Sequence, residues 1–295
     1  MRRQIEKQIL QLTGLSLGDV NYSEPTGDPG LFGPDAVCWR IHSDFPAMLC
    51  GGISALMLQM LHPLALAGVW DHSNFREDML GRLRRTSQFV AATTFAPISE
   101  AERLIERVRK IHTQVQGVAP DGRPYSAEDP ALLTWVHVCE VYSFMRGYLR
   151  YRNPNLSLKI QDNYYAEVAL IATKLGAERV PSSANEIEAY LQRMRGELVY
   201  NERTATVMQA LFNAPTPSTL TKPMGRSITM AGFDLLPDWA MRMQPKPISR
   251  PQRALARAAL VGMAPTLRWS LRNGVSTLAC RRMGILPFWQ RRSQF

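Results

Sequence analysis

The chain has 295 residues, of which 45% are hydrophobic and 20% are charged. These values are typical of a folded globular protein and exclude disorder over most of the length. The length is sufficient for one large domain or two small ones.

The net charge of +10 is concentrated at the C-terminal end. Residues 239–295 contain eleven Lys or Arg and no Asp or Glu, which leaves 24 basic and 25 acidic side chains in residues 1–238. Because the body of the chain is nearly neutral, we expect no nucleic-acid partner.

The four cysteines show no CxxC pairing, so we expect buried free thiols in a reducing compartment. The N-terminus resembles the start of an amphipathic helix and shows no apolar segment typical of a secretory signal. These features predict a cytoplasmic protein, with the cytoplasmic face of a membrane as the alternative location.

The run from Phe45 to Trp70 contains no charged residue over 26 positions. This length could cross a bilayer. However, Gly51-Gly52, Gln59 and His62-Pro63 interrupt the run, and no Lys/Arg cluster flanks it. We therefore predict a helix buried on all sides of a large α-domain. Since proline ends or kinks a helix at the preceding residue, His62 is expected at a break in backbone hydrogen bonding.

The segment after Asp71-His72-Ser73 is predicted to be another helix, and it contains the sequence RLRRT. Arg82 and Thr86 are four residues apart and share one face of this helix. The alternative for this basic run is a solvated surface.

Two histidines occur on the apolar faces of the next two predicted helices. His112 follows Leu104, Ile105, Val108 and Ile111 at helical spacing. His137 has a similar place on a later helix, for which Ser126 is the expected N-cap, and Gly117 is the expected C-cap of the earlier helix. Both imidazoles could reach one interior volume as ligands or general bases. The alternative is a structural histidine with both ring nitrogens hydrogen-bonded.

The rest of the chain is also predicted to be helical. We expect helices near 156–176, 184–200, 202–212, 250–263 and 265–273, and a Pro/Thr-rich connection at 213–228. No segment alternates with period two for long enough to predict a sheet. The expected fold is a single large all-α domain of about ten helices packed on one another.

Motifs for several kinds of chemistry are absent. His42 and Asp44 could contribute to a 2-His-1-carboxylate iron site, but that site is best known on β-rich folds. No Glu lies three residues before a His, as di-iron bundles require, and there is no HExxH, GxSxG or phosphate-binding glycine loop. A haem site needs only one axial nitrogen and a large apolar pocket between helices, so it remains compatible with the sequence.

Several motifs in this order resemble one oxygenase family. They are GPDAVCWR, LMLQMLHPLALAGVWDHS, RLRRT, IHTQVQG and YSAEDPALLTWVH. The resemblance is to the catalytic domain of the family that includes latex-clearing protein (rubber oxygenase) and the mycophenolic-acid-pathway oxygenase. It covers about residues 30–245 and is closest to a short bacterial branch.

The resemblance implies a globin-like all-α fold that holds b-type haem and uses dioxygen. His112 matches the axial ligand, Arg82 and Thr86 match residues of the haem pocket, and His137 is a further candidate for the pocket. The rubber enzymes place a catalytic glutamate above the haem, but no Glu occurs between Ile53 and Arg76. His62 or His72 would then occupy that side.

This resemblance predicts a haem b-dependent oxygenase that acts on a hydrophobic small molecule, including oxidative cleavage of a C=C bond. The alternative is a non-catalytic haem protein with bis-histidine ligation by His112 and His62. We divide the chain into an N-terminal helix and loop at 1–29, a haem-binding catalytic domain at 30–245, and a basic helical extension at 246–295.

The basic extension suggests a membrane partner. Its arginines are interleaved with Trp269, Phe288 and Trp289, as in surfaces that contact anionic lipid. The alternative is that these arginines face acidic groups on the body of the protein or solvate helix ends.

Overall fold

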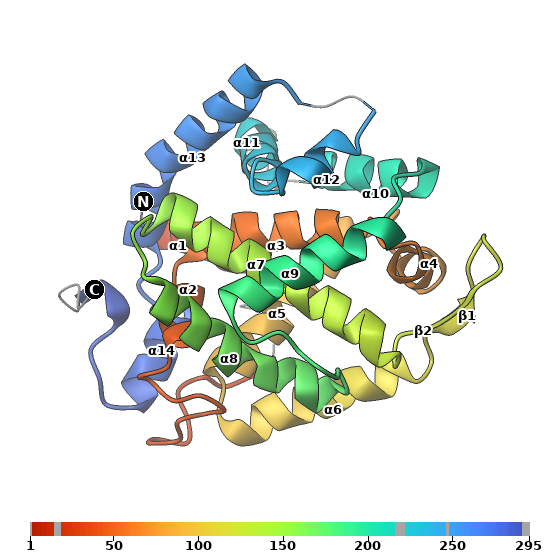
Figure 1. Ribbon diagram of the computed structural model, residues 1–295. Coiled ribbons are helices and arrows are strands. Elements are labelled where there is room, and N and C mark those ends of the chain that lie inside the picture. The colour runs from red at the N-terminus through yellow and green to blue at the C-terminus, as the bar shows by residue number, and fades with distance from the viewer. Residues whose placement is uncertain (1, 15–18, 216–221, 246–247, 291–295) are drawn as a thin grey trace.

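Helices account for most of the structure. The computed structural model describes residues 2–14, 19–215, 222–245 and 248–290. They form fourteen α-helices, two short 3-10 helices and one small hairpin, which confirms the predicted all-α domain (Figure 1). The α-helices are α1 (Arg2–Thr13), α2 (Val37–His42), α3 (Phe45–Gln59), α4 (Pro63–His72), α5 (Met79–Phe95), α6 (Ile98–His112), α7 (Pro130–Tyr151), α8 (Leu158–Leu175), α9 (Ala184–Met194), α10 (Glu202–Phe212), α11 (Lys222–Phe233), α12 (Asp238–Arg242), α13 (Arg250–Ser270) and α14 (Val275–Arg282).

The centre of the fold is the antiparallel packing of α3 against α7 (Figure 1). Two glycines bring the helix backbones close together. A Cβ at Gly51 would lie 2.9 Å from the carbonyl oxygen of Ser143, and one at Gly147 would lie 2.5 Å from that of Ala47. Nearly all of α3 is buried, as the uncharged run predicts.

The break predicted at His62-Pro63 is confirmed. α3 ends at Gln59 and α4 begins at Pro63, with His62 as the N-cap of α4. The two helices meet at 105°. Among the described helices, none alone is long and apolar enough to cross a membrane, and this bent pair meets that criterion only when the two are taken together.

A short β-hairpin separates α6 from α7, where the sequence predicted no sheet. β1 (Gln116–Val118) pairs with β2 (Pro124–Ser126), and each strand has three residues. The two predicted caps were wrong for this reason, since Gly117 and Ser126 both lie in strands. α6 ends earlier, with Thr113 as C-cap, and α7 begins later, with Asp129 as N-cap.

The C-terminal helices pack on the body through buried carboxylates. Asp234 is almost wholly buried and accepts hydrogen bonds from Arg150 (2.9 Å) and from Arg257 (2.9 and 2.7 Å). Arg253 lies 3.4 Å from the same carboxylate. These arginines therefore face acidic groups of the protein, as one of the two predicted alternatives for the basic extension stated.

The N-cap residue of α3, Asp44, also binds an arginine of the C-terminal extension. Asp44 caps α3 by accepting from the backbone N–H of Ala47, and its carboxylate is 2.8 Å from Nε of Arg268. Arg268 belongs to α13, which runs through Pro265 as one helix instead of the two predicted segments. Figure 1 shows α13 along one edge of the molecule.

The glycine at the centre of the α3–α7 contact gives a first prediction. We expect Gly147→Ala to lower the free energy of unfolding by roughly 1–3 kcal/mol, because the new methyl group would force two helix backbones apart. Urea denaturation followed by circular dichroism measures this change.

Gly262→Ala in α13 is the matched control. A Cβ at Gly262 would meet no atom within 4 Å, so this substitution should be neutral or stabilising by up to about 1 kcal/mol. Equal unfolding midpoints for the two variants would contradict the close approach of α3 and α7.

Candidate functional site

The candidate site residues lie around α4 and the ends of the helices next to it. His62 and His72 are at the two ends of α4. Arg82 on α5 donates to the hydroxyl of Ser73, the residue that follows α4, at 2.9 Å. His112 is the last residue of α6 and leads into the hairpin that packs on α4. The structure therefore brings segments 40 residues apart to one end of the helical domain.

His112 is half-buried, and its Nδ1 has no hydrogen-bond partner among the described residues. Burial lowers the pKa of its ring, so the imidazole is neutral at physiological pH. The predicted apolar face of α6 is buried only in part, because Ile105 is buried while Ile111 is 52% exposed. A neutral imidazole with a buried, unbonded nitrogen can donate a lone pair to iron.

His137 on α7 has the same property. The residue is buried, and its Nε2 lacks a hydrogen-bond partner within the described part of the chain. Burial lowers the pKa of the ring to about 4. An unpaired polar atom in the interior costs about 1–3 kcal/mol. Six other buried side-chain atoms of the described residues also lack a partner, and the two imidazole nitrogens differ from these in being able to bind a metal.

The other histidines have more of their hydrogen bonds satisfied. Nδ1 of His62 accepts from the backbone N–H of Leu64 at 3.3 Å, so this nitrogen is used to cap α4. His72 is exposed, and its Nε2 lies 3.2 Å from the carbonyl oxygen of Gln116. Neither position shows the unbonded buried nitrogen of His112 and His137.

His42 is the fifth histidine and shows what a structural histidine looks like in this fold. Its Nδ1 lies 2.8 Å from the hydroxyl of Thr94, and its Nε2 lies 2.9 Å from the hydroxyl of Tyr164. Burial lowers the pKa of the ring to about 3. Both nitrogens are occupied, so His42 has no lone pair for a metal.

Arg82 and Thr86 are one turn apart on α5 but have different surroundings. Arg82 is half-buried, and burial together with the nearby Arg85 lowers its pKa to about 10, so it stays charged at neutral pH. Thr86 is exposed and lies in the wall of a large pocket. Arg85 instead points to solvent, where it pairs with Asp78. Within the sequence RLRRT, Arg82 is therefore largely covered by the protein, whereas Arg85 faces solvent.

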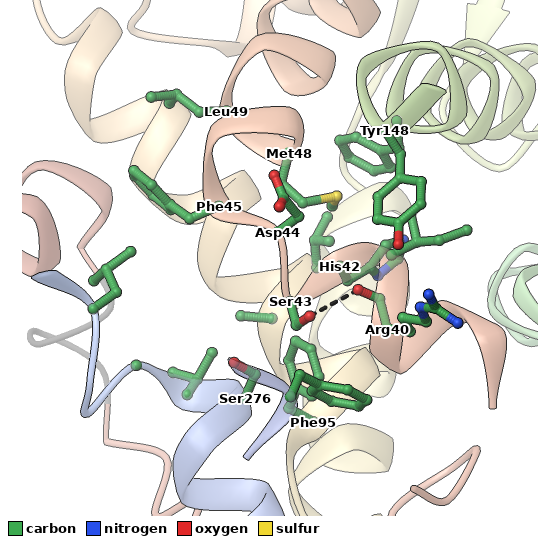
Figure 2. Close-up of a pocket in the computed structure, with 18 of the residues that line it drawn as sticks. Arg40, His42, Ser43, Asp44, Phe45, Met48, Leu49, Phe95, Tyr148 and Ser276 are labelled. Atoms are coloured by element: carbon green, nitrogen blue, oxygen red, sulfur yellow. Dashed lines mark hydrogen bonds between the residues drawn. The ribbon is translucent and has the colours of Figure 1, made fainter. Parts of the chain in front are cut away.

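The pocket beside α5 has a volume of about 620 Å³. Figure 2 shows part of its lining, with Phe45 and Leu49 of α3 on one side, Tyr148 of α7 on the other and Met48 between them. Phe95 of α5 lies below these residues in the view. Ser276 comes from the C-terminal extension. The wall is mainly apolar, with polar or charged side chains at several positions. These are Asp35, Arg40, His42, Ser43, Asp44, Thr86, Ser87, Tyr148, Arg152, Arg268, Arg272, Ser276 and Thr277.

A protein-family comparison adds an independent observation. Residues 39–269 match the family described as ER-bound oxygenase mpaB/B'/Rubber oxygenase, catalytic domain. The chain belongs to this family. The match confirms the predicted family and extends past residue 245 into α13. No curated protein and no solved structure matches the chain.

Membership establishes an oxygenase catalytic domain. Most elements that line the pocket or carry the candidate histidines lie within the matched range, including α4, α5, α6 and α7. Within the described ranges, no group of three or more His, Cys, Asp or Glu is gathered closely enough to hold a metal ion.

Glu140 is a candidate that sequence reasoning missed as a functional residue. It lies one turn after His137 on α7 and is half-buried. Burial raises the pKa of its carboxyl to about 7, while a hydrogen bond with Gln59 acts in the opposite direction. The signal in the sequence was an acidic residue on the apolar face of a helix, which often marks a group that holds a proton near neutral pH.

This carboxyl gives a second prediction. The folded protein keeps the Glu140 proton up to about pH 7, whereas the unfolded chain releases it near the ordinary value of 4.5. The free energy of unfolding therefore falls as pH rises between these values, by roughly 3 kcal/mol. Glu140→Gln should remove this contribution and stabilise the protein above pH 7.

The measurement is urea denaturation between pH 4 and 8. His137 acts in the opposite direction, because its lowered pKa makes stability rise with pH through the acidic range. Subtracting the profile of Glu140→Gln from that of the unsubstituted protein isolates the glutamate. The exposed Glu106→Gln is the control, and identical profiles for all three proteins would contradict a raised pKa at Glu140.

Proposed function

We propose that this oxygenase binds one b-type haem through His112 and uses dioxygen to oxidise a hydrophobic small molecule. The observation that supports this most directly is the buried, unbonded Nδ1 of the neutral His112 imidazole. The residues fit a haem because a single axial nitrogen from a helix is sufficient for it. The family membership supports oxygenase chemistry in general.

A bound haem would supply the redox-active iron that dioxygen chemistry needs. The protein contributes the surroundings. Arg82 stays charged at neutral pH, so its planar guanidinium can pair with a propionate or with negative charge that develops in the reaction. Glu140 holds a proton up to about pH 7 and could transfer it within the interior.

The pocket beside α5 suits the substrate. Its wall is mainly apolar, and its volume of about 620 Å³ is in the range of small-molecule sites. Thr86 supplies a hydroxyl on this wall, and its Oγ1 is 3.3 Å from the carbonyl oxygen of Arg82. Of the candidate residues, Thr86 lines this pocket, whereas Arg82, His112 and His137 do not. We infer that an apolar molecule occupies this pocket and that Thr86 helps to orient it.

A third prediction tests the axial ligand. In protein made with ample haem, His112→Ala should lose the Soret band and most of its haem, because the proposed nitrogen is removed. Haem content is measured as the pyridine haemochrome, and circular dichroism checks that the variant is folded. His72→Ala is the control and should keep normal haem content, since His72 is exposed.

Two results would contradict this assignment. The first is a normal Soret band and haem content in folded His112→Ala. The second is a loss of haem in His137→Ala but not in His112→Ala, which would make His137 the axial ligand. External imidazole restoring the spectrum of His112→Gly would support the original assignment.

The alternative is a non-catalytic haem protein with two histidine ligands. The unbonded Nε2 of His137 makes this residue a better second ligand than His62, whose Nδ1 already caps α4. Two strong axial ligands would close the iron to dioxygen. The reduced protein should bind carbon monoxide and shift its Soret band if it is an oxygenase. An unchanged spectrum would favour the bis-histidine protein.

A further inference from the structure

The outward face of α13 has no charged residue. The helix has 21 residues, and nine of its exposed residues share one side and are uncharged, while the exposed Arg250, Gln252 and Arg257 lie outside this group. Leu255 is 73% exposed, Val261 is 55% exposed and Trp269 is 44% exposed. The exposed face comprises Pro251, Ala254, Leu255, Ala258, Val261, Gly262, Pro265, Thr266 and Trp269. We call these nine residues the outer face of α13.

Three of the four arginines of α13 reach buried carboxylates of the body. Arg253 and Arg257 pair with Asp234, and Arg268 pairs with Asp44. An ordinary surface helix has the opposite arrangement, with apolar residues facing the body and charged residues facing water. Exposed apolar surface of this extent marks an interaction site.

The outer face of α13 and the large pocket have a residue in common. Trp269 is part of both the outer face and the pocket lining, and Trp289 lines the pocket beside it. Arg272 lies over the Trp289 ring at 3.8 Å from its centroid. Tryptophan is enriched at membrane–water interfaces, where its ring lies at the level of the headgroups, and arginine can extend its charged group to the same level.

We propose that the outer face of α13 lies on an anionic lipid bilayer and that an apolar molecule passes from the bilayer into the pocket between Trp269 and Trp289. The face is about 27 Å long at the rise of an α-helix, which is enough to rest on a membrane as an interfacial helix. The cations at its two ends are Arg250 and Arg272, and the segment from Trp239 onward contains no acidic residue.

A second copy of this chain would fit the face less well. Each copy carries a net charge of +10, and its excess of basic residues lies in the segment that contains α13. Contact between two copies through this face would bring their basic C-terminal segments together, which disfavours self-association. Anionic headgroups have the complementary charge, whereas the acyl chains match the apolar residues.

The test is vesicle binding by the full chain. The probes are vesicles of phosphatidylcholine alone and vesicles in which about one lipid in four is phosphatidylglycerol. Leu255→Gln/Val261→Gln removes apolar contact at two exposed positions and should weaken binding to the anionic vesicles by about ten-fold or more. Ile98→Gln/Leu158→Gln, at exposed apolar positions elsewhere, is the matched control and should bind like the unsubstituted protein.

Three outcomes would overturn the proposal. They are no binding of the unsubstituted protein to either vesicle, equal binding of both double variants, and a dimer in sedimentation velocity that Leu255→Gln/Val261→Gln dissociates. The last outcome would show that a second copy covers the face. Vesicle binding does not require haem, so His112→Ala should bind as the unsubstituted protein does, and a failed haem assignment would leave this result unchanged.

Discussion

The close packing of α3 against α7 is the constraint on which the other elements depend. With Gly51 and Gly147 at the contact, the two backbones approach too closely for larger side chains. The same pair of helices carries Gln59, His137 and Glu140 at one end and the walls of the large pocket at the other. A shift of either helix would therefore change both the surroundings of His137 and the shape of the large pocket.

The parts of the fold that follow from local patterns were predictable. The uncharged run produced a buried helix, and Pro63 placed the break where His62 caps α4. The errors arose where tertiary contacts decide the outcome. Gly117 and Ser126 have cap-like sequences, but the hairpin between α6 and α7 uses them as strand residues and places the caps at Thr113 and Asp129.

The sequence could predict which histidines face the interior, but it could not predict the hydrogen bonds and pKa values that decide their chemistry. Helical spacing placed His112 and His137 on inner faces, but it could not show which nitrogens find partners. His42 illustrates the difficulty, because Thr94 and Tyr164 satisfy its ring from segments 52 and 122 residues away. The raised pKa of Glu140 likewise depends on burial by several helices, which no short motif encodes.

The unbonded imidazole nitrogens connect the stability of the fold to its function. Each buried nitrogen without a partner costs about 1–3 kcal/mol in the protein alone. A group that binds His112 or His137 only in the folded state would offset this cost and stabilise the native protein by mass action. His42 carries no such cost, because both of its nitrogens are already bonded. Among the five histidines, His112 and His137 therefore carry a cost that a bound ligand would offset.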